Sequence, residues 1–598
     1  MNAFSKTVAL LTPRERFHGG ILIIVLVLMG IPEVAGIASI MPFIAVLATP
    51  VLVESNKWLN WCYSYLDFSS INSFLFFLGV MVIAVLVINN ACKAFVSWYI
   101  ARYTNMCRHS MSRRMLASYL CKPYVFFLNR NTAELGKNVI AEIDKVVDGA
   151  LRPFIDIMSQ GVTTLFIVTL LVVMDPLLAV SIAVALGITY MLIYAMVHKK
   201  LSVIGDLRTE SNEGRFQTAD DALGGIKEIK ILGREKSFLD RYSVHSERLS
   251  DYHTTFGIVS LVPLFAVEII AFGGILLIVL QLIYVRHSLT QALPMIALYA
   301  FSTKRLMPAF QGIFSGFASI RFHRSMLDVL YKDMAEREVL KPAMDVTEPV
   351  APLPYSRMLR LENISFTYPE LEENVIKDLD LAIAARSMIA FVGATGSGKT
   401  TLMDIILGLL KPERGCMKVD NEVILDGNIR RWQRNIGYVP QFIYLSDDTV
   451  ARNIAFGVSD DEIDMKAVER AAKIANVHDF IKELPRGYKT MVGERGVRFS
   501  GGERQRIGIA RALYHDPEVL ILDEATNALD GITEDVIMEA IHSLSHGKTI
   551  IMIAHRLTTV KNCDVIYVMD CGHIVAQGKY QELMQTCERF RAMAKMED

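Results

Sequence analysis

Long apolar runs in the first half of the chain constrain its fold more than any other feature of the sequence. Several runs of twenty or more mostly apolar residues fall within the first 320 residues, and the last 240 residues contain none. A membrane-crossing helix takes about 20 such residues. The sequence therefore predicts six transmembrane helices, over 19–48, 71–100, 153–174, 177–197, 256–283 and 289–318.

The basic residues between these spans predict the orientation of the chain. Nine Lys and Arg residues lie in 101–152 and ten in 198–255, whereas 49–70 and 284–288 contain one each. The positive-inside rule then places both termini and both long loops in the cytoplasm. A net charge of −1 gives no sign of a nucleic-acid partner, and the eight cysteines have no metal-binding spacing.

The two long loops are expected to be helices that continue beyond the bilayer, because they are polar and nearly free of Pro and Gly. Segments 123–135 and 213–235 interrupt them with aromatic, charged and helix-breaking residues, and within the second the elbow is expected at 213–222. Each suits a short elbow that docks onto another domain, and an ordinary helical hairpin is the alternative.

The first outer loop, 55–68, predicts a short helix capped by Ser55 with one aromatic-rich face. The residues of that face are Trp58, Trp61, Cys62, Tyr65 and Leu66. Such a face suits a helix that lies in the membrane interface. A loop packed on its own helices is an equal alternative.

Ionisable residues at membrane depth are costly, so Glu33, Lys93, Glu268 and Arg305 are candidates for function. Lys93 and Arg305 suit either an anionic headgroup or pairing with the two glutamates. A structural ion pair is favoured for Glu33 and Glu268, and the role of Arg305 is left open.

Composition marks a boundary after the membrane half. Segment 322–358 begins with charged, helix-like sequence and continues as "KPAMDVTEPVAPLPYSR", whose four prolines are typical of a stiff, extended connector. The expected domains are a transmembrane domain over 1–321, a linker over 322–358 and a nucleotide-binding domain over 359–598. The predicted fold class is an α-helical six-span domain followed by a C-terminal α/β P-loop ATPase domain.

The stretch "MIAFVGATGSGKTTLMDIILGLL" at 388–410 has the strand, Gly-rich loop and helix that a P-loop requires. Its glycines let the backbone approach the phosphates of ATP, Lys399 reaches the β- and γ-phosphates, and Thr400 supplies an oxygen for Mg²⁺. The expected ATP-binding residues of this loop are Gly393, Ala394, Thr395, Gly396, Ser397, Gly398, Lys399, Thr400 and Thr401.

A second apolar strand, within "EVLILDEAT", ends in Asp523, which is expected to orient the Mg²⁺ shell. Glu524 follows directly and is the best candidate for the general base that activates the attacking water. A role for Glu524 as a mere helix cap is the weaker alternative.

The order of motifs in 358–590 resembles that of ABC-transporter ATPases. The motifs are "FTYP" with Tyr368, "VPQ" with Gln441, "VGERG" at 492–496, "FSGGE" at 499–503, "ALD" at 528–530 and "IAHR" with His555. The resemblance implies that Tyr368 stacks on adenine and that His555 senses the γ-phosphate during catalysis. It also implies that Gln441 joins the Mg²⁺ site to the membrane domain.

The same resemblance implies a partner chain. The signature residues are Ser500, Gly501, Gly502 and Glu503, and the D-loop contributes Asp530. In the family the signature faces the γ-phosphate of ATP held by the opposing ATPase domain. Since this chain has one P-loop and one signature, two chains must meet head to tail, which implies a homodimer.

The signature and the D-loop depart slightly from the family pattern. Phe499 and Glu503 stand for the usual Leu and Gln, and "NALD" stands for "SALD". Closure of the dimer is expected to survive, with the charge of Glu503 slowing it slightly.

The chain as a whole resembles type IV ABC exporters, and its aromatic outer helix resembles that of bacterial lipid-linked oligosaccharide flippases of the PglK type. In those proteins such a helix is thought to hold the polyprenyl tail while arginines hold the pyrophosphate. Trp58 and Trp61 suit the first role and Arg305 the second. Leu264, directly after Pro263, stands where those flippases would have a basic residue.

The expected function is ATP-driven export or flipping of an amphiphilic substrate across the bacterial inner membrane, with ATP and Mg²⁺ as cofactors. A lipid-linked oligosaccharide or a related polyprenyl-pyrophosphate glycolipid is the first candidate cargo. A general lipid, drug or peptide exporter and an ATP-gated channel or sensor are the alternatives. The multi-pass chain is expected to keep both termini and the ATPase domain in the cytoplasm.

Overall fold

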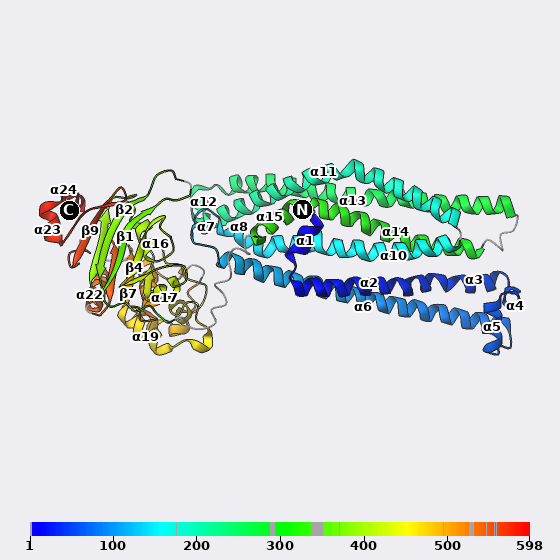
Figure 1. The fold of residues 1–598 in the computed structure, drawn as a ribbon, viewed down its shortest axis with the longest axis horizontal. Helices are drawn as coiled ribbons and strands as arrows, with labels where there is room; N and C mark the ends of the chain where they lie inside the picture. Colours follow the sequence, from blue (N-terminus) through cyan, green and yellow to red (C-terminus); the bar gives the residue numbers. More distant parts are fainter. Residues whose placement is uncertain are drawn as a thin grey trace. The chain divides into compact units, whose positions relative to one another are not determined.

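The chain forms two compact units in the computed structural model. The structure describes all residues except 1–2, 175, 287–292, 336–350, 370, 494–495, 525–530, 546, 555, 558 and 598. A helical unit consists of Met1–Lys122 and Asn129–Met344, and an α/β unit consists of Pro123–Leu128 and Asp345–Asp598. A helical unit and an α/β unit agree with the predicted fold class (Figure 1).

The helical unit is built from long helices joined by short ones (Figure 1). Its helices are α1 (Ala3–Leu10), α2 (Pro13–Ala38), α3 (Ile40–Ala48), α4 (Leu52–Ser55), α5 (Lys57–Tyr65), α6 (Ile71–Leu120), α8 (Thr132–Lys137), α9 (Ile143–Val146), α10 (Arg152–Met174), α11 (Pro176–Gly224), α12 (Ile226–Leu232), α13 (Glu235–Arg286), α14 (Leu293–Phe322) and α15 (Arg324–Ala335). Two π-helical turns, η1 (Asn138–Glu142) and η2 (Val147–Leu151), lie on either side of α9.

Three of these helices are much longer than a bilayer is thick. Helices α6, α11 and α13 have 50, 49 and 52 residues. At about 1.5 Å per residue each measures about 75 Å, whereas the hydrocarbon core is about 30 Å thick. The expectation that the long loops are extensions of the spans is therefore confirmed.

Apolar length supports the membrane assignment. Among the described residues, four helical segments are long and apolar enough to cross a membrane: Pro13–Ala48, Ile71–Leu120, Glu134–Met174 and Glu235–Ile270. Helices α11 and α14 cover the other two expected spans. Within the unit, α2 packs along α6, α10 along α14 and α11 along α13 (Figure 1).

The first elbow forms where it is expected, and the second is shifted. Helix α6 ends at Leu120, and the short helix α7 (Val125–Leu128) belongs to the α/β unit, where Val125 packs against the core. The expectation for 213–222 is wrong, because these residues continue α11. The short helix is α12, which follows the helix-breaking pair Gly224–Gly225 and ends at Gly233 with φ of +61°.

The outer helix α5 presents apolar side chains on two faces. Its cap is Asn56 rather than the expected Ser55, because the Asn56 side chain accepts hydrogen bonds from the backbone N–H groups of Trp58 and Leu59. Leu59 and Cys62 pack on an apolar cluster of the bundle, so Cys62 leaves the expected aromatic face. The exposed face consists of Trp58, Trp61, Tyr65 and Leu66. Packing on the protein's own helices is thus observed for Leu59 and Cys62, and a place of the exposed face in the membrane interface stays a prediction.

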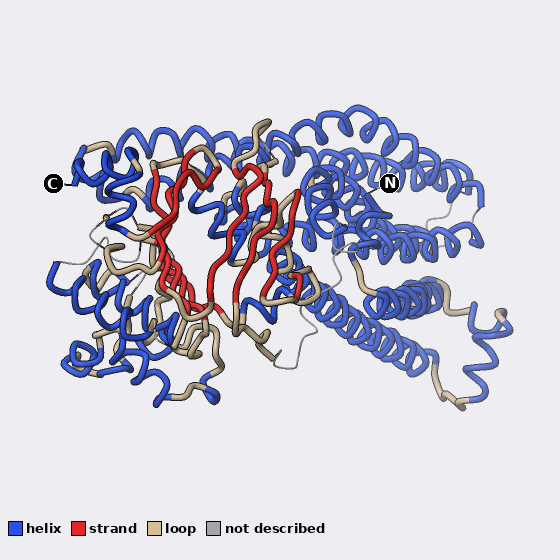
Figure 2. The backbone as a smooth tube through the Cα atoms, turned by 60° about the vertical axis from the view of Figure 1, so that its left-hand side comes forward, coloured by secondary structure: helices blue, strands red, loops and turns tan. Residues whose placement is uncertain are grey.

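The α/β unit contains two sheets (Figure 2). The first is antiparallel, in the order β2 (Ile376–Ala384), β1 (Met358–Phe366), β4 (Arg414–Val419), β5 (Glu422–Val423). The second has the order β10 (His573–Gly578), β9 (Val565–Asp570), β3 (Met388–Gly393), β8 (Thr549–Ile553), β7 (Val519–Asp523), β6 (Ile436–Val439). From β9 to β6 neighbouring strands of the second sheet are parallel, and β10 is antiparallel to β9.

The parallel strands are buried on both faces, which explains their continuous apolar sequences. In β3, Ala390 and Val392 belong to one apolar cluster, and Ile389 and Phe391 belong to another. The carboxyl ends of these strands lead into the loops that carry the nucleotide motifs, at the edge where α/β folds bind ligands.

The end of α14 holds a histidine in close packing. An added Cβ on Gly149 would lie 2.4 Å from the His323 ring, and Nδ1 of His323 lies 2.9 Å from the Ser319 carbonyl oxygen. Burial, and then the positive charge of Arg208, lower the pKa of His323 from 6.5 to about 4, and His253 and Lys145 act in the same direction. The folded chain therefore holds His323 neutral at pH values where the unfolded chain protonates it.

We expect acid to destabilise the protein through His323. Because the folded-state pKa lies below the unfolded value, the stability is complete above pH 6.5 and is lost as the pH falls toward 4, by about 2 kcal/mol between pH 7 and pH 5. Thermal unfolding of wild type and His323→Gln at the two pH values measures this, and His18→Gln, at an exposed site, is the control. An equal loss in wild type and His323→Gln would contradict the assignment.

Candidate functional site

The P-loop pattern forms the predicted strand, loop and helix. Residues 394–398 connect β3 to helix α16 (Lys399–Ile406). Gly396 and Gly398 have φ of +81° and +99°, a region that favours glycine. An added Cβ on Gly398 would lie 2.9 Å from Cδ1 of Ile376. The conformation of this loop therefore depends on its glycines.

Lys399 directs its charge into the loop. Its ammonium group donates hydrogen bonds to the carbonyl oxygens of Gly393 (2.8 Å) and Ala394 (2.9 Å), and the residue is 5% exposed. Burial lowers the pKa of Lys399, while the carboxylates of Glu524 and Asp523 oppose this shift. Lys399 at the start of α16 is thus close enough to the acids at the end of β7 to feel their charge.

Each of the two acids accepts a hydrogen bond from a side chain in or after β6. Nε2 of Gln441 donates a hydrogen bond to Oε2 of Glu524 at 2.6 Å, and the hydroxyl of Tyr438 donates to Oδ2 of Asp523 at 3.4 Å. Glu524 has φ of +50°, which is uncommon outside glycine and is found preferentially at functional sites. This backbone conformation directly follows the buried strand β7.

Tyr368 lies against the helix of the P-loop. Its hydroxyl and that of Thr401 are 3.1 Å apart, and its ring contacts Phe366 edge-on at 5.0 Å between centroids. His555 and Asp530 lie outside the described residues, so their predicted roles stay predictions.

The signature forms the start of helix α21 (Gly501–Leu513). Ser500 and Glu503 make a capping box: the Ser500 N–H donates to the Glu503 carboxylate at 2.8 Å, and the Glu503 N–H donates to the Ser500 hydroxyl at 3.3 Å. The charge of Glu503 is thus already engaged by the helix terminus. Arg511 anchors the other end by donating to the carbonyl oxygens of Asn453 and Tyr444, both at 2.7 Å.

The P-loop and the signature are separate in the chain as described. Among the described residues no hydrogen bond joins 500–503 to 393–401, although each segment has the conformation expected of an anion site.

A charged cluster joins four helices of the helical unit. Nζ of Lys93 (α6) lies 2.5 Å from Oε1 of Glu33 (α2), and Nη1 of Arg305 (α14) lies 3.9 Å from the same oxygen. The hydroxyl of Thr163 (α10) donates to Oε2 of Glu33 at 3.0 Å. The Glu33 side chain is 7% exposed, whereas those of Lys93 and Arg305 are 29% and 35% exposed. Two partly accessible cations therefore share one buried carboxylate.

Uncharged polar groups extend this cluster. Asn89 precedes Lys93 by four residues on α6, and Ser302 precedes Arg305 by three on α14, so each lies on the same helix face as the cation. Both are buried, and neither Oδ1 of Asn89 nor Oγ of Ser302 has a hydrogen-bond partner among the described residues. The expected pairing of Glu33 is confirmed. Glu268 is exposed and has no partner among the described residues.

Comparisons with known proteins identify both units. The ABC transporter transmembrane region matches residues 34–285, and the ABC transporter family model matches residues 376–527. An ATP-dependent lipid A-core flippase of Cupriavidus pinatubonensis is 30% identical over 495 residues, which cover 79% of this chain and 80% of that protein. The chain belongs to the ABC transporter family.

Further similarities agree with this family. An ATP-dependent lipid A-core flippase of Ralstonia nicotianae is 29% identical over 521 residues, covering 84% of each chain. The solved structure of a bacterial Atm1-family ABC exporter with ATP bound has a TM-score of 0.75 at 24% identity, and covers 96% of this chain and 97% of that chain. The protein is an ABC exporter half-transporter whose helical membrane domain precedes an ATPase coupled to transport.

The residues near Asp523 fit Mg²⁺ in the transporter. Asp523, the exposed hydroxyl of Thr400 and the amide oxygen of Gln441 are hard oxygen donors of the kind that Mg²⁺ prefers. Among the described residues no group of three or more His, Cys, Asp or Glu side chains is arranged to hold a metal.

One acid close to Asp523 was not predicted from the sequence. Asp404 lies in α16, five residues beyond Lys399, and is 9% exposed. Burial, and then the neighbouring Asp523 carboxylate, raise the pKa of Asp404 from 3.8 to about 6. The signal in the sequence is a lone acid within the apolar run "LMDIILGLL".

We expect Gly398→Ala to disable the P-loop of the transporter. A methyl group there is strained by the positive φ and by contact with Ile376, at a cost of about 1–3 kcal/mol. ATP affinity, measured by titration of the purified protein, should fall at least ten-fold. Gly427→Ala is the control, because an added Cβ there meets nothing within 4 Å. Equal affinity in the two variants would contradict the assigned loop conformation.

Proposed function

We propose that this ABC exporter is a homodimeric flippase for an anionic glycolipid. The observation that carries the proposal is the cluster of Glu33, Lys93, Arg305 and Thr163. One carboxylate faces two cations, so the cluster holds one positive charge in excess. Charges at membrane depth are costly and mark sites of function.

The geometry of the cluster suits a headgroup phosphate. Arg and Lys are the side chains that bind phosphate oxygens best, through charge-assisted hydrogen bonds. Lys93 and Arg305 are partly exposed while the carboxylate between them is buried, so the accessible side of the cluster is positive. The amide of Asn89 and the hydroxyl of Ser302 supply further polar contacts.

Two classes of glycolipid meet this description. The relatives of this chain in Cupriavidus pinatubonensis and Ralstonia nicotianae carry the name of lipid A-core flippases, which favours a lipid A-core cargo. The exposed Trp58 and Trp61 of α5 favour a polyprenyl-pyrophosphate-linked oligosaccharide of the PglK type. Both cargoes combine negative charge, sugar and hydrocarbon.

In our proposal, ATP bound to the α/β unit drives the movement of the cargo. Lys399 and the loop backbone bind the phosphates, and Tyr368 stacks on adenine. Thr400, Asp523 and Gln441 would hold Mg²⁺, which would supply positive charge against the phosphates. Glu524 takes the proton of the attacking water. The Gln441–Glu524 hydrogen bond supports a direct connection between the proposed base and Gln441, to which we assign the link with the membrane domain.

The second half of each ATP site comes from the partner chain. Ser500, Gly501 and Gly502 lie at a helix N-terminus, whose N–H groups and dipole favour a phosphate. The proposal completes each P-loop with this signature from the other protomer, because one chain carries one of each. ATP then favours the closed dimer, and its hydrolysis removes that bias. We place the ATPase domain and both termini in the bacterial cytoplasm, from the basic loops.

We expect Glu524→Gln to bind ATP and not hydrolyse it. The amide keeps the size of the side chain and removes the basic group, so turnover should fall at least a hundred-fold while ATP affinity stays within about three-fold. A closed dimer should accumulate with ATP, which size-exclusion chromatography and nucleotide trapping detect. Undiminished turnover would show that Glu524 is not the base.

We expect Lys93→Ala and Arg305→Ala to reduce stimulation of the ATPase by cargo. Activity in liposomes is measured with lipid A-core, with polyprenyl-pyrophosphate oligosaccharide and with a neutral glycolipid. In both variants, the stimulation of ATPase activity by the anionic lipids should fall at least five-fold, while basal hydrolysis stays unchanged. Lys304→Ala, at the exposed neighbouring position, is the matched control.

The three lipids also decide the cargo class. Stimulation by one anionic glycolipid alone identifies the cargo. Stimulation by the neutral lipid alone, or equal stimulation in wild type and both variants, would contradict an anionic headgroup site at the Glu33 cluster.

A further inference from the structure

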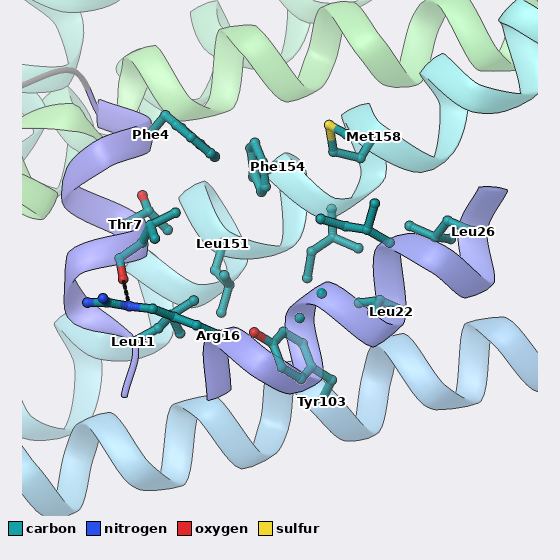
Figure 3. A pocket seen from close by; sticks show the side chains of 15 residues that line it. Phe4, Thr7, Leu11, Arg16, Leu22, Leu26, Tyr103, Leu151, Phe154 and Met158 are labelled. Carbon is teal, nitrogen blue, oxygen red and sulfur yellow. Dashed lines mark hydrogen bonds between the residues drawn. The ribbon is translucent and has the colours of Figure 1, made fainter. Parts of the chain in front are cut away.

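A cavity lies beside the N-terminal helix α1, and none of the residues of the Glu33 cluster lines it (Figure 3). It has a volume of about 220 Å³ and is enclosed by α1, α2, α6 and the segment from η2 to α10. Phe4 and Phe154 lie together at one side of the cavity, with 4.6 Å between ring centroids. Leu22 and Leu26 line the cavity from α2 (Figure 3). The wall consists almost wholly of apolar side chains.

The few polar groups of the wall are already bonded to the backbone. The Thr7 hydroxyl donates to the Ala3 carbonyl oxygen, the Tyr103 hydroxyl donates to that of Glu15, and Nε of Arg16 donates to that of Val8, all at 3.0 Å. The cavity therefore offers little to water or to a polar ligand, since a bound water needs two to four polar partners. Its occupant has to be apolar.

The membrane around α2 determines which apolar molecule can enter the cavity. The cavity lies along the first turns of the span Pro13–Ala48. Ile23, at its edge, is 39% exposed, and the neighbouring Phe17 and Ile24 are 69% and 61% exposed. In a membrane this face of α2 is covered by lipid chains, so the cavity opens from a surface that hydrocarbon already touches.

The size of the cavity limits the occupant to part of a lipid. It exceeds the ~150 Å³ apolar cavity that holds benzene and is smaller than the ~300–1,000 Å³ of typical ligand pockets. One stretch of a single acyl chain fits, and a whole glycolipid does not. Arg14 and Arg16 are exposed at the same end of α2, which favours an anionic headgroup outside the cavity.

We propose that the cavity binds one acyl chain of an anionic membrane phospholipid, which holds helix α1 on the bundle. Helix α1 has eight residues, too few to be stable by itself, so its position depends on packing. A chain between α1 and α10 adds apolar contact beside the Phe4–Phe154 ring pair, where the cavity otherwise leaves the two helices apart. This site is independent of the cargo cluster and of the ATP sites.

Photolabelling in vesicles tests the proposal. The full-length protein is reconstituted in phosphatidylglycerol vesicles that contain a small fraction of phosphatidylglycerol with a diazirine in one acyl chain. After illumination, mass spectrometry maps the adducts. We expect adducts on lining residues such as Phe4, Leu151, Phe154 and Met158.

Two variants fill the cavity from opposite walls. Gly20 lines it, and an added Cβ there meets nothing within 4 Å, so Gly20→Phe places a ring at the cavity, and Val8→Phe adds one from α1. Each should reduce the adducts on the lining residues at least five-fold. Gly161→Phe is the matched control, because Gly161 has equal space but lies away from the cavity. It should keep the adducts.

Several results would overturn the proposal. Wild-type adducts confined to the outward residues Phe17 and Ile24 would show that no chain enters, whether or not the variants fold. An equal loss in Gly161→Phe would show that the effect is not local. Displacement of the phosphatidylglycerol adducts by equimolar lipid A-core, with no displacement by unlabelled phosphatidylglycerol, would assign the cavity to the cargo instead.

Discussion

The carboxylate of Glu33 lies at membrane depth, where an unpaired charge would cost several kcal/mol, and its partners come from three other helices. Lys93, Arg305 and Thr163 connect α2 to α6, α14 and α10. Because two cations meet one carboxylate, the same contacts that hold these helices together leave a positive charge accessible. Helix packing and the proposed binding of cargo therefore depend on one cluster, and under this proposal a change in helix arrangement alters both.

In the ATPase domain, too, a small part of the structure positions several groups. Strands β3 and β7 are buried on both faces, and this fixes the points at which the P-loop and the pair Asp523–Glu524 begin. The left-handed backbone of Glu524 and the hydrogen bond from Gln441 then set the direction of the proposed base. Buried strands thus position the proposed reactive groups, of which Asp523 is itself buried and Glu524 half-buried. In our proposal the signature adds an anion site for the ATP that the partner chain binds.

The sequence predicts most of this arrangement because its patterns are local. The strand, loop and helix around Lys399 follow from an apolar run and glycine spacing. The lengths of α6, α11 and α13 follow from apolar runs that continue into polar sequence nearly free of Pro and Gly. The shift of the second short helix to α12, the Asn56 cap and the inward turn of Cys62 depend on packing that a helical pattern does not record. The pairing of Glu33 with both Lys93 and Arg305 joins residues far apart in the chain. Hydrophobic periodicity therefore does not predict this pairing, and it does not predict the burial of Asp404.

The central claim, that each ATP site is shared between two chains, is tested most directly with mixed dimers. Two differently tagged chains, one with Lys399→Ala and one with Ser500→Ala, are co-expressed and purified through both tags, and trapped nucleotide per dimer is measured. Shared sites predict about one trapped nucleotide, because one pairing of P-loop and signature stays intact, whereas neither parent homodimer traps any. No trapped nucleotide in the mixed dimer would contradict the claim, since it is the result for sites completed within single chains.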